Sequence, residues 1–127
     1  MPEGVVNVRY MVDDVQESVD WYVGNLGFSV QLNASPAFAA VERGALRLLL
    51  SGRGASAGRP MPDGRQPGPG GWNRFQFIVE DIGAEVERLR ARGVRFRNDI
   101  VMGPGGSQIL ADDPSGNAVE LFQPAAG

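Results

Sequence analysis

The chain has 127 residues, of which 43% are hydrophobic and 21% are charged, and its formal net charge is −3. This length suits one domain with a substantial core. The mild negative charge argues against a nucleic-acid partner, because neutralising phosphates requires a basic surface. The sequence contains no His, Cys or Lys. The usual nitrogen and sulfur ligands of zinc, copper and non-haem iron are therefore missing, as are thiolate, Ser–His and Schiff-base nucleophiles.

No targeting or membrane segment is visible in the sequence. No stretch approaches the roughly 18 apolar residues of a membrane-spanning helix. The first residues lack the basic region and apolar run of a signal peptide. The absence of cysteine removes disulfides as evidence for secretion. We therefore expect a cytoplasmic protein that binds neither membranes nor nucleic acid.

One pattern occurs twice along the chain. Residues 5–12 alternate like a strand, an acidic pair follows at 13–14, and a helical segment ends near Gly27. Residues 72–79, the acidic pair at 80–81 and a helical segment ending near Gly93 repeat this order. One acid of each pair is expected to cap its helix, and the two glycines are predicted left-handed terminators. The first helix has an apolar stripe made of Val15, Val19, Tyr22, Val23 and Leu26.

Short strands are predicted after each helix, at 28–32, 38–42 and 46–50, and again at 94–97, 108–111 and 118–123, with a turn at 113–117. The sequence thus predicts an α+β domain of two βαβββ modules within residues 1–127. The N-terminal module covers 1–51 and the C-terminal module covers 72–127. The connector at 52–71 is rich in Gly, Pro and Arg, and it is either a mobile link or a lid over a ligand.

Several short motifs resemble those of a known family. They are Val12-Asp13-Asp14-Val15, Trp21-Tyr22 and Leu26-Gly27-Phe28 near the start, and Gly103-Pro104-Gly105-Gly106 and Asp113-Pro114-Ser115-Gly116-Asn117-Ala118-Val119-Glu120-Leu121 near the end. Together they resemble the vicinal oxygen chelate superfamily of glyoxalases, bleomycin resistance proteins and extradiol dioxygenases. The segment Gly70-Gly71-Trp72-Asn73-Arg74 resembles an actinobacterial subgroup. The resemblance implies a cup-shaped mixed sheet with helices on its convex face, and a homodimer.

Metal-dependent members of that superfamily place four ligands in the cup. The resemblance puts the two opening positions on Asn7 and Arg74, counted from the ends of the opening strands. The closing positions fall on Leu48, by analogy with the spacing of Glu120 from its turn glycine, and on Glu120 itself. Only Glu120 keeps the ligand chemistry of the family. We therefore expect no metal and no other cofactor.

Strand alternation divides each opening strand into an apolar face, expected to meet the helix, and a mixed face, expected to line the cup. We predict an ion pair between Arg74 and Glu120, which either stiffens the sheet or holds a polar group of a ligand. Trp72 either stacks on a planar ligand or packs, and the two phenylalanines in the set either line the cup or belong to the core. The predicted ligand-binding residues are Asn7, Arg9, Met11, Phe38, Leu48, Trp72, Arg74, Gln76, Glu120 and Phe122.

Three functions are compatible with these residues. The first is a metal-independent protein that sequesters a natural product or antibiotic, which needs only pocket shape, aromatic faces and a few polar groups. The second is an enzyme with an atypical or absent metal site, in which Glu120 is the general base and Arg74 or Arg9 holds an anion. The third is an interaction protein whose cup is filled by side chains such as Met11 and Leu48. We predict the first function.

Overall fold

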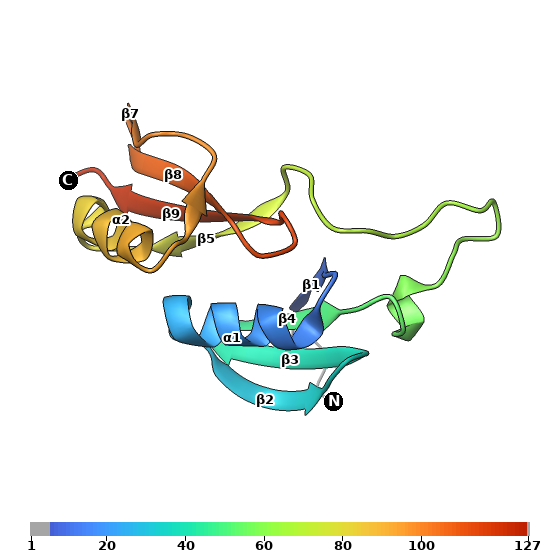
Figure 1. Ribbon diagram of the computed structural model, residues 1–127. Helices are drawn as coiled ribbons and strands as arrows, with labels where there is room; N and C mark the ends of the chain where they lie inside the picture. Colours follow the sequence, from blue (N-terminus) through green and yellow to red (C-terminus); the bar gives the residue numbers. More distant parts are fainter. Residues whose placement is uncertain (1–5, 127) are drawn as a thin grey trace. The chain divides into compact units, whose positions relative to one another are not determined.

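The structure, a computed structural model, describes residues 6–126. Its contacts divide the chain into two compact units, with the boundary in the sequence between Gly70 and Gly71. Each unit contains one α-helix and one mixed sheet (Figure 1). The predicted α+β class with two βαβββ modules is confirmed.

The first unit has a four-stranded sheet in the order β1-β4-β3-β2. β1 is parallel to β4, whereas β4, β3 and β2 pair antiparallel. The helix between β1 and β2 accounts for this order, because it carries the chain across the sheet before the antiparallel strands begin. The elements are β1 (Asn7–Met11), α1 (Val15–Leu26), β2 (Ser29–Ala34), β3 (Phe38–Arg43) and β4 (Leu46–Ser51).

Helix α1 begins and ends where the sequence predicted. The Asp14 carboxylate accepts a hydrogen bond from the Glu17 amide at 3.0 Å, which makes Asp14 the N-cap. Gly27 ends the helix with φ 71°, in the left-handed region. The predicted stripe is buried apart from Val23, which is exposed. The helix packs on β3 and β4 and so covers the apolar face of the sheet (Figure 1).

The second unit repeats this arrangement, with the strand order β5-β9-β8-β6. β5 is parallel to β9, while β8 pairs antiparallel with β9 and with the short strands β6 and β7. The sequence did not predict β7, which forms a hairpin with β8 where Gly103 faces Gly106. The elements are β5 (Arg74–Ile78), α2 (Ile82–Ala91), β6 (Arg95–Phe96), β7 (Val101–Gly103), β8 (Gly106–Asp112) and β9 (Ala118–Pro124).

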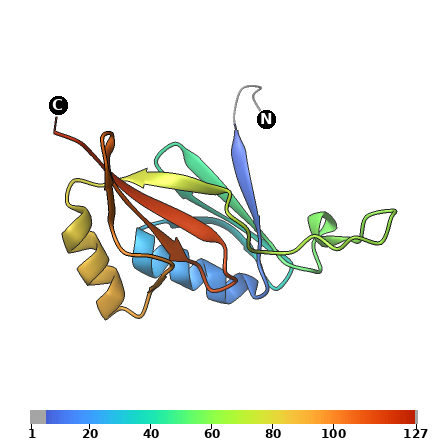
Figure 2. The same ribbon diagram turned by 90° about the horizontal axis from the view of Figure 1, so that it is seen from above.

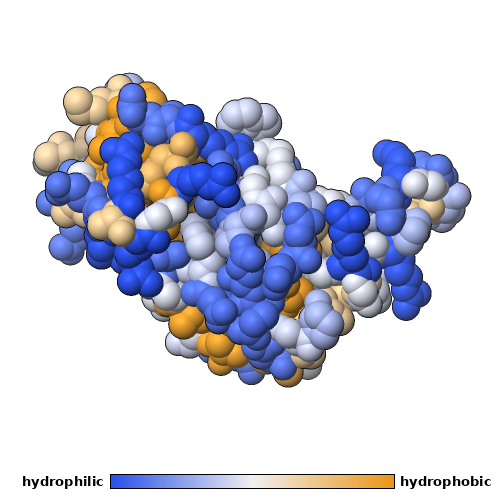
Figure 3. Space-filling view, in the orientation of Figure 1, coloured by the Kyte–Doolittle hydropathy of each residue, from blue (hydrophilic) through white to orange (hydrophobic). Residues whose placement is uncertain are grey.

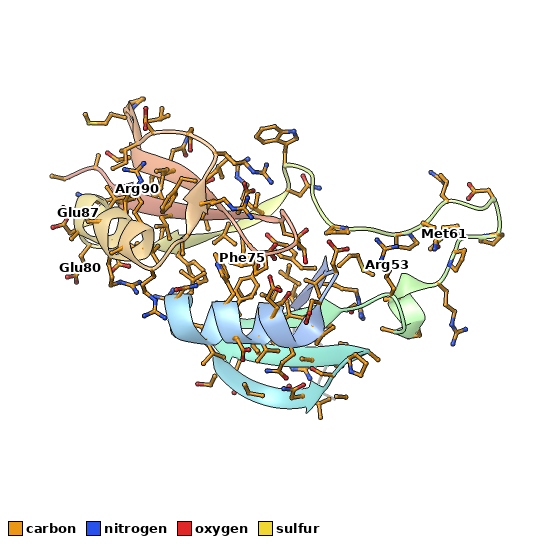
Figure 4. All side chains as sticks on the ribbon, in the orientation of Figure 1. Arg53, Met61, Phe75, Glu80, Glu87 and Arg90 are labelled. Atoms are coloured by element: carbon orange, nitrogen blue, oxygen red, sulfur yellow. The ribbon has the colours of Figure 1, made fainter. Side chains whose placement is uncertain are left out.

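Helix α2 is built like α1. The Asp81 carboxylate accepts a hydrogen bond from the Ala84 amide at 3.0 Å, and Gly93 follows the helix with φ 86°. The helix contacts β9 and runs along one side of the second sheet (Figure 2). Its buried side chains are Ile82, Val86 and Leu89. Its outward side chains include Glu87 and Arg90 (Figure 4).

The connector between the sheets has little regular structure. It contains one short 3-10 helix, η1 (Ser56–Gly58), and its surface is mostly hydrophilic (Figure 3). Arg53 at its start forms a 3.5 Å ion pair with Asp13, and Met61 lies near its middle (Figure 4). Within residues 6–126, no helix is long and apolar enough to cross a membrane.

Candidate functional site

The second sheet has one apolar face and one mixed face. The apolar face includes Phe77, Ile109 and Leu121, which are buried on the side of the sheet occupied by α2. The strand register places polar and apolar side chains together on the opposite face, because paired residues point to the same side. We call this the mixed face of the second sheet. It is formed by Arg74, Gln76, Ile78, Gln108, Leu110, Asp112, Ala118, Glu120 and Phe122.

A hydrogen-bonded network lies at the centre of this face. Arg74 Nε lies 2.9 Å from Glu120 Oε1, which confirms the predicted ion pair. Gln76, directly opposite Glu120 in the register, donates from Nε2 to Oε2 at 2.6 Å. The Glu120 side chain is only 7% exposed, whereas that of Arg74 is 31% exposed. A buried carboxylate needs such partners, and here both of its oxygens have one.

Arg97, which the sequence analysis did not single out, organises the edge of the same unit. Its Nε lies 2.6 Å from the Asp112 carboxylate. Its Nη2 donates to the Gly116 carbonyl at 2.9 Å, and its Nη1 donates to the Gly71 carbonyl at 2.8 Å. The side chain is only 17% exposed. One guanidinium thus joins β8, the turn before β9 and the end of the connector.

Trp72 lies between this arginine and the network. The Arg97 guanidinium carbon is 4.7 Å from the centroid of the Trp72 ring, within the range of a cation–π contact. Arg74 Nη1 donates to the Trp72 carbonyl at 3.1 Å. The residue remains 68% exposed. Its main chain and one face of its ring are therefore held while most of the side chain stays in solvent.

The first sheet has a mixed face of its own. β1 contributes Asn7, Arg9 and Met11, as the sequence predicted. Arg9 Nη1 donates to the buried Ser51 hydroxyl at 2.7 Å. Phe38 is opposite Ser51 in the register and is half-buried on this face. These residues belong to one unit, and Arg74, Gln76, Glu120 and Phe122 belong to the other.

The structure corrects the placement of Leu48. Leu48 pairs with Val8 and is completely buried on the apolar face of the first sheet, so it does not lie with Asn7 and Arg9. The residue opposite Arg9 is Leu49, just as Glu120 is opposite Gln76. Counting from the turn glycine was one residue short, and a shift of one residue reverses the face on which a strand residue lies.

The residues of this site do not fit a divalent metal ion. Both Glu120 oxygens accept hydrogen bonds from Arg74 and Gln76, and a guanidinium at this place repels a cation. The matching position in the first sheet is the aliphatic Leu49. No group of three or more His, Cys, Asp or Glu side chains suited to hold a metal occurs in the described part of the chain.

The sequence matches one family model over nearly its whole length. Residues 4–121 match the model described as the glyoxalase/bleomycin resistance protein/dioxygenase superfamily. No curated protein matches the chain.

Solved structures of the same fold come from several bacteria. A lactoylglutathione lyase from Agrobacterium tumefaciens has a TM-score of 0.74 at 20% identity, and the match covers 96% of this chain and 94% of that one. A superfamily member from Sphaerobacter thermophilus has a TM-score of 0.69 at 28% identity, with 93% and 96% covered. TnmS3, an antibiotic binding protein from a Streptomyces species, has a TM-score of 0.66 at 24% identity, with 98% and 100% covered. These similarities extend over almost all of each chain.

Proposed function

Because the chain belongs to the glyoxalase/bleomycin resistance protein/dioxygenase superfamily, we propose that it binds and sequesters a small natural product or antibiotic without a metal ion. The observation that carries this proposal is the Arg74–Glu120–Gln76 network. It occupies the centre of the mixed face of the second sheet, with a carboxylate that has donors on both oxygens. Such a network can orient a polar group of a ligand, and it has no place for a Lewis acid.

The surroundings of the network support binding of a partly apolar molecule. Ile78 on β5 is 60% exposed, and Phe122 and Leu110 are half-exposed on the same face. Apolar surface with a few oriented polar groups is typical of small-molecule sites. The antibiotic binding protein of the same fold is a precedent for this use of the fold.

We extend the proposal to a homodimer with two equivalent sites. The resemblance to the superfamily implies that a module of one copy faces a module of the other copy across each cup. A twofold axis then generates both sites. The mixed faces of both sheets carry predicted ligand-binding residues, with Arg9 on the first and Arg74 on the second. The molar mass in solution, measured by light scattering during gel filtration, tests this part directly. A monomer at micromolar concentration would contradict it.

An enzyme is the alternative function, with Glu120 as general base. To act as the general base, Glu120 would have to give up the negative charge that holds its ion pair with Arg74 and strengthens its hydrogen bond from Gln76. This requirement favours binding over proton transfer.

The test combines metal analysis, binding and recovery of the ligand. The purified protein is analysed for metals and screened by thermal shift against intact aromatic antibiotics, with and without added metal ions. We expect no stoichiometric metal, a shift that survives a chelator, and a ligand recovered chemically unchanged. The variant Arg74→Ala should lose most of the ligand-induced shift. The matched control Arg65→Ala, whose ion pair with Asp63 is exposed, should keep it.

Two outcomes would contradict the proposal. A stoichiometric metal bound beside Glu120 would point to metal-dependent chemistry. Conversion of the ligand during incubation would establish an enzyme.

A further inference from the structure

Trp72 is largely exposed to solvent, which is unusual for a large aromatic side chain. An indole at the end of a segment with little regular structure normally buries its apolar surface. Here its main chain is fixed on both sides of the residue, since the Gly71 carbonyl accepts from Arg97 and the Trp72 carbonyl accepts from Arg74. The residue as a whole stays 68% exposed. The structure therefore holds one face of the indole and leaves the other accessible.

The cation behind the ring restricts what can stack in front of it. Arg97 lies 4.7 Å from the ring centroid and is itself anchored by Asp112 and Gly116. Its positive charge draws on the electron density of the indole, so the exposed face is a poor partner for a second cation. A neutral or anionic planar ring suits that face better.

Arg74 supplies a polar anchor next to the ring. Its Nε and Nη1 donate to Glu120 and to the Trp72 carbonyl. Its Nη2 takes part in neither of these two hydrogen bonds. The side chain is partly exposed, and guanidinium nitrogens are strong donors to anionic oxygens. A ligand oxygen can therefore reach Arg74 while an attached ring lies on Trp72.

We infer that the ligand is a planar aromatic molecule with an anionic oxygen, whose ring stacks on the exposed face of Trp72 and whose oxygen accepts a hydrogen bond from Arg74. This inference rests on the proposed binding function and specifies its ligand class. Trp72 and Arg74 bind the ligand, and Arg97 is a positioning residue that acts through the indole.

Fluorescence provides the test, because the chain has two tryptophans. The variant Trp21→Phe leaves Trp72 as the sole tryptophan reporter. Three probes separate the requirements: 2-naphthoate is planar and anionic, 2-naphthylmethylammonium is planar and cationic, and cyclohexanecarboxylate is anionic without an aromatic ring. We expect 2-naphthoate to bind at least about tenfold more tightly than either of the others and to quench Trp72 emission.

Variants of the three residues complete the test. Trp72→Ala should weaken 2-naphthoate binding by about tenfold, and Trp72→Phe should restore most of it. Arg97→Gln should weaken binding while Arg74 is retained, and it should broaden or shift Trp72 emission before any ligand is added. Because Trp72 is exposed, its replacement leaves folding intact, which circular dichroism checks.

Several results would overturn the inference, and they differ from those that would overturn the proposed function. If an antibiotic binds tightly but Trp72→Ala leaves its affinity unchanged, the proposed function stands and the stacking site is wrong. Equal binding of the cationic probe also refutes the inferred ligand class. If Trp72→Ala converts a dimer into a monomer, and no probe quenches the Trp72 emission of the Trp21→Phe variant, the indole is a subunit contact. If no probe and no antibiotic binds, both proposals fail.

Discussion

The Arg74–Glu120 pair should make a measurable contribution to stability, because the carboxylate is buried. The Arg74 Nε–Glu120 Oε1 distance is 2.9 Å, and two unit charges about 4 Å apart attract each other by about 4 kcal/mol at an effective dielectric constant of 20. Removing one partner of a fully buried pair costs about 3–5 kcal/mol. Arg74 is 31% exposed and Gln76 still donates to the carboxylate at 2.6 Å. We therefore expect Arg74→Met to lower the free energy of unfolding by about 2 kcal/mol.

A double-mutant cycle isolates this interaction. Urea unfolding is measured for the original chain, Arg74→Met, Glu120→Gln and the double variant, and the coupling free energy should be about 1–2 kcal/mol. The double variant should be more stable than the sum of the single losses implies, because it leaves no buried charge without a partner. Arg88 and Glu85, an exposed ion pair on α2, provide the control cycle. Their coupling should be about 0.3–0.5 kcal/mol.

Additive single effects at Arg74 and Glu120, or losses below about 0.5 kcal/mol for each, would refute this reasoning. Either result would mean that water already solvates the carboxylate, and the network would then be too weakly held to orient a ligand group.

Three further predictions, which need four variants, test the fold by urea unfolding. Leu48→Ala should lower the free energy of unfolding by about 2–5 kcal/mol because Leu48 is completely buried. A loss below about 1 kcal/mol would contradict the placement of Leu48 in the core. Asp14→Ala should cost about 1 kcal/mol through the lost cap of α1, so an unchanged urea midpoint would contradict that role. Gly106→Ala should lower the free energy of unfolding more than Gly27→Ala does, because a Cβ at 106 would overlap the Gln123 carbonyl while one at 27 meets nothing within 4 Å. Equal losses for the two variants would contradict this prediction.

The elements could be predicted from the sequence because their signals are local. The acidic pairs, the apolar stripes and the glycines at 27 and 93 bound both helices, and Asp14 and Asp81 proved to be the caps. The repeat of these signals gave the module order, which the strand pairing confirms. The Arg74–Glu120 pair followed from the family resemblance together with strand alternation.

The predictions that were wrong or missing depend on strand register and long-range contacts, which local patterns do not determine. Gly44 precedes Leu49 by five residues, whereas Gly116 precedes Glu120 by four, and only the paired structure reveals that Leu49 and Glu120 are equivalent. Arg97 was missed for a similar reason. Its partners at Gly71 and Gly116 are 26 and 19 residues away, and no spacing rule connects them.

Within residues 6–126, the hydrogen bonds of the Arg74 and Arg97 networks join residues between Gly71 and Glu120, inside a single unit. Selection can therefore act on the two halves separately. Substitutions in the first half can alter the shape and charge of its own surface without disturbing these bonds. A chain of this kind could diversify its specificity through one module while the other keeps its electrostatic framework.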